Sequence, residues 1–87
     1  MDTALTPAVE RIARVLAGQH LSINADGDQE SASGAVDASW EWYRDDAIAV
    51  LHTLRAPSEK MAAAGDPAVW ERMVLAAIEE AKPGVVL

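Results

Sequence analysis

Oxygen-bearing side chains between Asn24 and Glu30 alternate along the chain in a way that is typical of calcium-binding loops. A loop of the EF-hand type also requires glycine at its sixth position and glutamate at its twelfth. Counted from Asn24, those positions hold Gln29 and Ala35, and the register that starts at Asp26 fails in the same way. The spacing therefore favours an ordinary solvated loop over a calcium site.

Histidine and serine, the other residues suited to metal binding or catalysis, are present without the partners that such chemistry needs. His20 and His52 are the only histidines, and His52 lies two helical turns from Asp45, a spacing that does not converge on one metal ion. No serine has an evident activating base, and Ser58 is expected to cap a helix. The sequence thus predicts no catalytic residue, no metal ligand and no bound cofactor. A small metal-dependent enzyme is the least favoured alternative.

Three of the four aromatic residues stand in the segment Trp40-Glu41-Trp42-Tyr43. On a helix, Trp40 and Tyr43 fall on one side and Trp42 falls nearly opposite. We expect Trp42 either to be covered by a loop or by the chain ends, or to be an exposed anchor for a partner. In the second case Asp45 and Asp46 are the neighbouring candidate contacts, and a second copy of the chain is one candidate partner.

Helix start and stop signals organise the whole chain around these residues. A capping residue followed by proline marks two helix starts, and proline or glycine marks most of the ends. The expected elements are a first helix from Thr6-Pro7 to Gly18, a flexible acidic loop over 19–34, a second helix over 35–54, a helical turn over 59–64, a last helix from Asp66-Pro67 to about residue 82, and a C-terminal tail over 83–87.

Apolar residues recur at helical spacing in each expected helix. The sequence therefore predicts an all-α fold for residues 1–87, a single helical domain built as a small three-helix bundle with a short extra helical turn and one long polar loop. The second and last helices are expected to pack through Trp40, Tyr43, Leu51, Leu54, Trp70, Met73 and Ile78. The last helix has so wide an apolar face that two neighbours are expected for it.

The net charge of the chain limits the classes of partner that are expected. Seven basic and fourteen acidic residues give a net charge of −7, which argues against nonspecific binding of nucleic acid and of anionic membranes. The acidic surface serves solubility, docks on a basic protein partner, or imitates nucleic acid. The N-terminal segment lacks the pattern of a secretion signal and the chain has no cysteine, which together indicate a cytoplasmic protein.

Residues 42–78 resemble a loose group of small uncharacterised helical proteins from alphaproteobacteria and their phages. That group carries a Met-Arg-Glu-Pro-Ser/Thr-Glu-x-Met segment, an Ala-Gly pair and a Trp-x-x-Met-Ile/Val-x-Ala-Ala helix. The matching segments here are Leu54-Arg55-Ala56-Pro57-Ser58-Glu59-Lys60-Met61, Ala64-Gly65 and Trp70-Glu71-Arg72-Met73-Val74-Leu75-Ala76-Ala77. Leu54 and Ala56 depart from the pattern. The resemblance implies a compact helical unit and a phage or prophage setting, and it implies no activity.

Together these features predict a non-catalytic protein-interaction module that uses an acidic helical surface, with Trp42, Asp45 and Asp46 as candidate contacts. Its partner would be an unidentified protein that carries basic residues. The alternative is a phage-type inhibitor or nucleic-acid mimic that acts on a host defence complex.

Overall fold

The computed structural model describes residues 4–24 and 29–81, and all regular secondary structure in these residues is helical. The elements are α1 (Ala8–Asn24), α2 (Gln29–Ser39), the 3₁₀ helix η1 (Trp40–Tyr43), α3 (Arg44–Leu54), α4 (Glu59–Ala64) and α5 (Pro67–Ala81). The prediction of an all-α fold is confirmed for this part of the chain. The three-helix bundle is not confirmed, because five α-helices and a 3₁₀ helix stand where three helices and a turn were expected.

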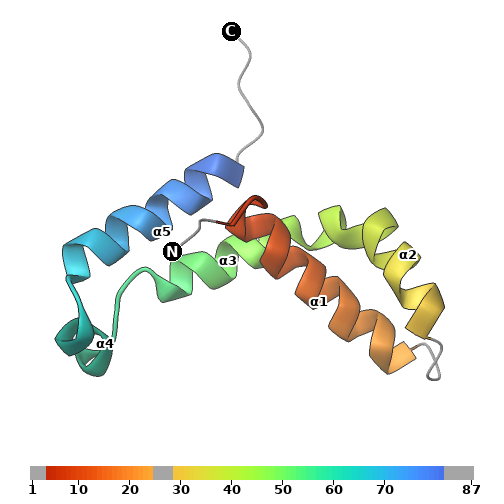
Figure 1. Ribbon diagram of the computed structural model, residues 1–87, viewed down its shortest axis with the longest axis horizontal. Coiled ribbons are helices and arrows are strands. Elements are labelled where there is room, and N and C mark those ends of the chain that lie inside the picture. Colours follow the sequence, from red (N-terminus) through yellow and green to blue (C-terminus); the bar gives the residue numbers. More distant parts are fainter. Residues whose placement is uncertain (1–3, 25–28, 82–87) are drawn as a thin grey trace, which may run out of the picture.

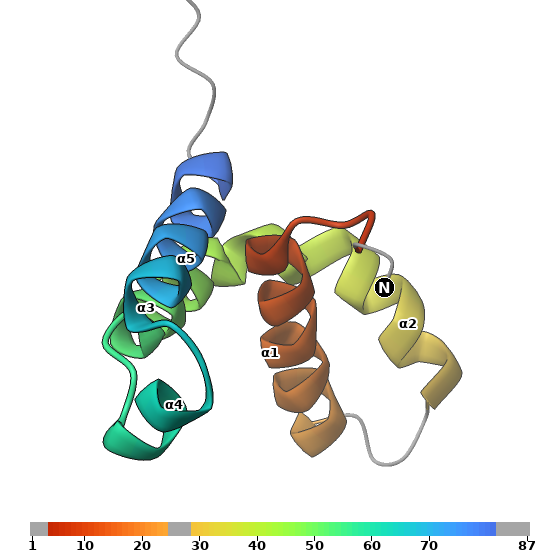
Figure 2. The ribbon, with the colours of Figure 1, turned by 60° about the vertical axis from the view of Figure 1, so that its left-hand side comes forward.

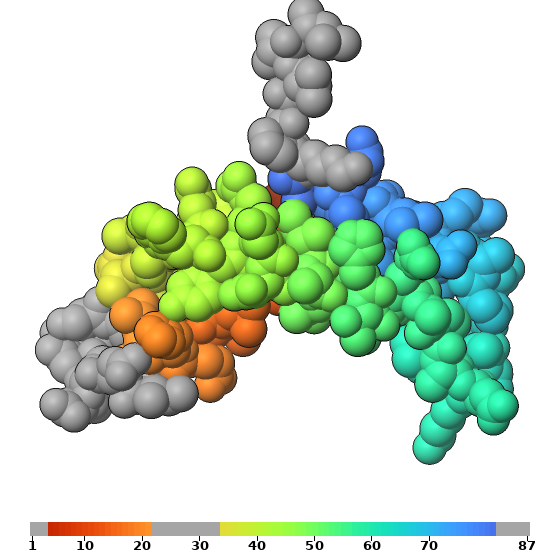
Figure 3. Space-filling model, turned by 180° about the vertical axis from the view of Figure 1, so that it is seen from behind, coloured from red at the N-terminus to blue at the C-terminus, as the bar shows by residue number. Residues whose placement is uncertain are grey.

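The helices form an open arch (Figures 1 and 2). α2, η1 and α3 follow one another along a bent path, α1 lies against all three, and α5 lies along α3. α4 lies between α3 and α5 in the chain and projects away from both (Figure 1). Seen from behind, the surface is hollowed beneath α3, between α4 and the end of α1 (Figure 3). The radius of gyration is 15.4 Å, whereas a compact domain of this length has about 12 Å.

The buried core is small and rich in alanine. Among the described residues the buried apolar side chains are Val9, Ala13, Ala17, Ala47, Leu51, Val74 and Ile78. The alanines allow the backbones of neighbouring helices to approach closely, but each removes little apolar area from water. The fold is therefore held by the contacts of α1 with α2, η1 and α3 and of α3 with α5, rather than by a thick layer of large side chains.

The predicted core is right in part. Leu51 and Ile78 are buried, and Trp40, Tyr43 and Trp70 are half-buried and pack against the core. The prediction is wrong for Leu54 and Met73, which are 41% and 64% exposed. The reason is that α5 packs mainly on α3 and meets α1 only to a limited extent, so the second neighbour expected for its wide apolar face is largely missing.

The prediction that Gly18 ends the first helix is wrong, because α1 continues to Asn24. The predicted loop over 19–34 is likewise wrong for 19–24 and 29–34, which are helical, while 25–28 lie outside the described residues. Glycine in a helix costs only about 1 kcal/mol relative to alanine, which tertiary packing can offset. Here α1 packs along α2 and η1, and Ala17, next to Gly18, is fully buried.

The predicted continuous helix over 35–54 is also wrong, because η1 interrupts it. Ser39 Oγ donates a hydrogen bond to the carbonyl oxygen of Ala35 at 2.6 Å, a back-bond that bends helices. Ser39 and Tyr43, which flank and close the 3₁₀ turn, have φ/ψ of −125°/−5° and −102°/8°, outside the α-helical range. The bend divides what would be one helix into α2 and α3, and we call the bent segment, residues 39–43, the elbow.

The predicted helix ends around α4 are confirmed. The Ser58 hydroxyl accepts a hydrogen bond from the backbone N–H of Met61 at 3.3 Å. Asp66 Oδ1 accepts one from the N–H of Ala68 at 2.9 Å, which caps α5 as the Asp-Pro pair predicts. α1 begins at Ala8, close to the predicted start, and the predicted tail over 83–87 lies outside the described residues.

Candidate functional site

The short helix η1 presents Trp42 to solvent. A 3₁₀ helix has three residues per turn, so Trp40 and Tyr43 point the same way and Trp42 points elsewhere. Trp40 and Tyr43 accordingly pack against the core, whereas Trp42 is 84% exposed. The described residues thus leave Trp42 uncovered, as the expectation of an exposed anchor requires. The chain ends, which the other expectation placed over Trp42, lie outside the described residues.

Two arginine side chains contact the ring of Trp40, on the core-facing side of the elbow. Arg14 Cζ lies 5.4 Å from the centroid of the Trp40 ring, and Arg44 Cζ lies 5.3 Å from it. A guanidinium over an indole face is attracted by the ring electrons. Trp40 is thus clamped between α1 and the start of α3, which fixes the direction of η1 and hence of Trp42.

Arg14 also ties α1 to α2. Its Nη1 donates to Asp37 Oδ1 at 2.6 Å, and its Nε donates to Glu10 Oε2 at 2.8 Å. These two hydrogen bonds, with Asp37 the larger contributor, raise the pKa of Arg14 above its usual value. Because the shift is upward, this stabilising contribution is fully present below the ordinary pKa and is lost only in strong alkali.

Tyr43 secures the elbow from the end of α1. Its ring centroid lies 6.1 Å from that of His20, and the two rings are tilted by 50°. This separation and tilt fall within the range of favourable aromatic pairs. The elbow is therefore bound to α1 through Trp40 and Tyr43 together.

Asp45 and Asp46, the two other predicted site residues, stand in the first turn of α3. Both are exposed, and neither forms an ion pair with any described residue. Carboxylates are favoured there by the partial positive charge of the helix N-terminus. Three and four positions beyond Trp42, they form with it a surface that we call the Trp42 patch. Exposed Glu41 adds a further carboxylate beside it.

The chain matches no protein-family model, no curated protein and no solved structure.

The structure gives no support to a metal centre among the side chains that it describes, those of residues 4–21 and 34–81, where no three histidine, aspartate or glutamate side chains are grouped to hold an ion. His52 is exposed on α3 and joins no carboxylate cluster there. The segment from Asn24 to Glu30 falls mostly outside the described residues. Within them, no helix combines the length and the apolar character that crossing a bilayer requires.

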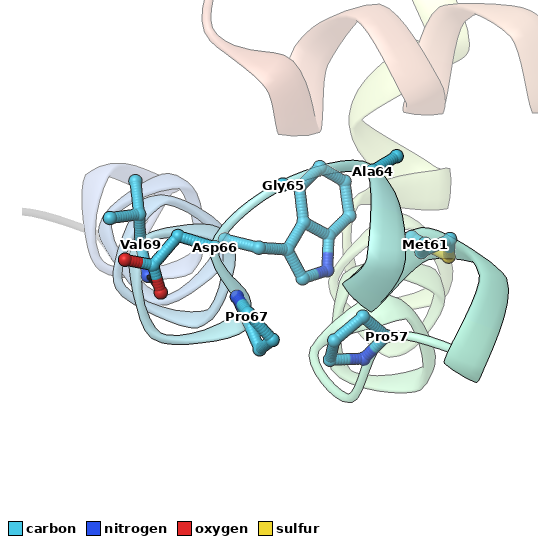
Figure 4. Close-up of a pocket in the computed structure, with 8 residues that line it drawn as sticks. Pro57, Met61, Ala64, Gly65, Asp66, Pro67 and Val69 are labelled. Carbon is cyan, nitrogen blue, oxygen red and sulfur yellow. Dashed lines mark hydrogen bonds between the residues drawn. The ribbon is translucent and has the colours of Figure 1, made fainter.

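The structure adds an apolar hollow of about 400 Å³ that sequence reasoning missed, between α4 and the start of α5. Pro57 and Pro67 face each other across it, with Met61 and Ala64 on the α4 side and Val69 on the α5 side (Figure 4). Trp70 also lines it, and the indole Nε1–H donates a hydrogen bond to the carbonyl oxygen of Leu54 at 2.7 Å. The sequence did contain a signal for this hollow. The pairs Pro57-Ser58 and Asp66-Pro67 enclose a helix of only six residues, which is too short to pack its apolar residues closely against the neighbouring helices.

Proposed function

We propose that this protein is a non-catalytic interaction module that docks on a basic protein through the Trp42 patch. The observation that carries the proposal is the 84% exposure of a tryptophan on an elbow that Arg14 and Arg44 hold in place. Tryptophan is enriched among residues that dominate binding energy, and a contact that is already ordered loses little entropy on binding. A cytoplasmic location, which the lack of cysteine suits, belongs to the same proposal.

The chemistry of the patch defines its partner. The indole of Trp42 requires an apolar pocket, and the unpaired carboxylates of Asp45 and Asp46 require arginine or lysine at its rim. Rim charges act mainly on the association rate and are screened by salt. Binding should therefore weaken as the salt concentration rises, and the Trp42 contact should set most of the dissociation rate.

The test is affinity capture from cell extract with the immobilised wild-type chain and three variants. Trp42→Ala should lose the captured partner, and the double variant Asp45→Asn with Asp46→Asn should release it at lower salt. Leu75→Ala is the matched control, because Leu75 is an exposed apolar residue on α5, away from the patch. The proposal fails if every protein captured by the wild type is captured equally well by Trp42→Ala.

A second candidate is a phage-type inhibitor or nucleic-acid mimic that acts on a host defence complex. It is favoured by the three exposed carboxylates Glu41, Asp45 and Asp46, which lie close together in the chain. The resemblance of residues 42–78 to the phage-associated group also supports it. For a mimic, removal of the carboxylates should abolish binding, Trp42→Ala should leave it largely intact, and double-stranded DNA should compete for the same partner.

A further inference from the structure

The charge of the chain is unevenly distributed, and one stretch of 32 residues is neutral. Residues 47–78, which comprise most of α3, α4 and most of α5, carry three basic and three acidic residues. The net charge of −7 therefore resides entirely in the rest of the chain. We call residues 47–78 the neutral arm. Two copies that met through this arm would bring no excess of like charge into contact.

The neutral arm also holds most of the unburied large apolar side chains. Of the nine such residues in the described part of the chain, the arm carries six, namely Val50, Leu54, Met61, Val69, Met73 and Leu75. α4 makes no extensive contact with any other described helix. The hollow between α4 and α5 lies in the same arm and is lined almost entirely by apolar groups.

The size of the neutral arm indicates what could cover it. A stable interface of standard size buries about 800 Å² on each partner and involves about 20–30 residues a side. The arm has 32 residues, and most of them are exposed. A second copy of the same arm is therefore a partner of the required size.

We propose that a second copy of this chain docks on the neutral arm, around a two-fold axis, and fills the hollow between α4 and α5. Met61, 41% exposed on the wall of the hollow, is the central contact of this interface. Arg55 and Glu71 stand at its rim. Their contact within one chain is long, 4.0 Å between Nε and Oε2, and both side chains are about half exposed, so each is available to pair across the axis.

The proposed interface includes none of Trp42, Asp45 and Asp46, so this inference is independent of the proposed function. The two also respond oppositely to salt. Docking of the acidic patch on a basic partner weakens as salt rises. Dimerisation of two chains that each carry −7 strengthens as salt rises, because salt screens the repulsion between the acidic residues outside the two arms while the neutral apolar contact is little affected.

Sedimentation equilibrium over a range of concentrations and salt tests the inference. The wild type should approach twice its 9.3 kDa mass, more completely at high salt. Met61→Lys should weaken the dimer at least about tenfold, because an ammonium group would be desolvated without a partner. Ala64→Lys, at an exposed position on the same hollow, should act likewise, and circular dichroism of both variants establishes that they remain folded.

Val15→Lys is the matched control, since it places the same charge on an exposed apolar position of α1, outside the arm. It should dimerise as the wild type does, and so should Trp42→Ala. The inference is overturned by a wild type that is monomeric throughout, by folded Met61→Lys and Ala64→Lys variants that dimerise normally, or by loss of the dimer in Trp42→Ala. The last result would assign the interface to the Trp42 patch instead.

Discussion

Alanine substitution of Trp40 and Trp42, one at a time, separates a structural tryptophan from one that is free to bind. A tryptophan side chain buries about 150–250 Å² when fully enclosed, so one that is 84% exposed buries only about 25–40 Å². At about 25 cal/mol per Å² its loss costs under about 1 kcal/mol. Trp40 packs against the core and has two guanidinium groups within 5.4 Å of its ring centroid, so its loss should cost about 2–4 kcal/mol.

These magnitudes are large relative to the stability of the chain, which at 87 residues should be about 4–13 kcal/mol. In thermal unfolding followed by circular dichroism, the midpoint should therefore fall by at least about 10 °C for Trp40→Ala and by only a few degrees for Trp42→Ala. In urea unfolding, the midpoint should fall in the same order. If Trp42→Ala destabilises as much as Trp40→Ala, something in solution covers Trp42, and it is not a free contact.

Five further substitutions test other parts of the structure. Leu51→Ala, in the core, should cost about 2–5 kcal/mol in urea unfolding and clearly more than Leu54→Ala, which removes a 41% exposed side chain; equal costs would contradict the packing of α5 on α3. In the monomer, at low protein concentration and low salt, Asp66→Ala removes the cap of a core helix and should lower global stability by about 1 kcal/mol, whereas Ser58→Ala should only speed amide exchange within α4; a global loss at Ser58 would show that α4 packs on the rest of its own chain. Arg14→Lys should lower the thermal midpoint, because an ammonium group lacks the planar fork with which the guanidinium reaches two carboxylates while it lies near an indole ring, and an unchanged midpoint would refute that role.

The fold class and several helix ends could be predicted because each depends on neighbouring residues in the chain. Ser58 and Asp66 cap helices in the structure as their positions before Glu59 and Pro67 predict. The end of the first helix could not be predicted in the same way. Whether Gly18 stops a helix depends on the contacts of the turn that follows, and those contacts come from α2 and η1, which are distant in the sequence.

The outward direction of Trp42 was predictable from angular position, because Trp42 differs from Trp40 and Tyr43 in direction on either kind of helix. What holds the site was not predictable. The clamp on Trp40 requires Arg14, 26 positions earlier, to reach η1, and only the crossing of α1 over the elbow brings it there. The exposure of Met73 was missed for the converse reason, since the neighbour expected to cover it does not extend that far.

The two glycines inside the α1–α2 pair set the mutational tolerance of the protein. A methyl group added at Gly18 would meet Val36 Cγ2 at 3.8 Å, an ordinary contact, and one added at Gly34 would meet nothing within 4 Å. Packing therefore does not require glycine at either position, and each lowers helix stability by about 1 kcal/mol relative to alanine. The free energy of unfolding of the chain is thus lower than that of the same fold with alanine at these two positions. Replacing both glycines would raise the free energy of unfolding. Destabilising substitutions elsewhere, including those that create a new binding surface, could then accumulate without unfolding the protein.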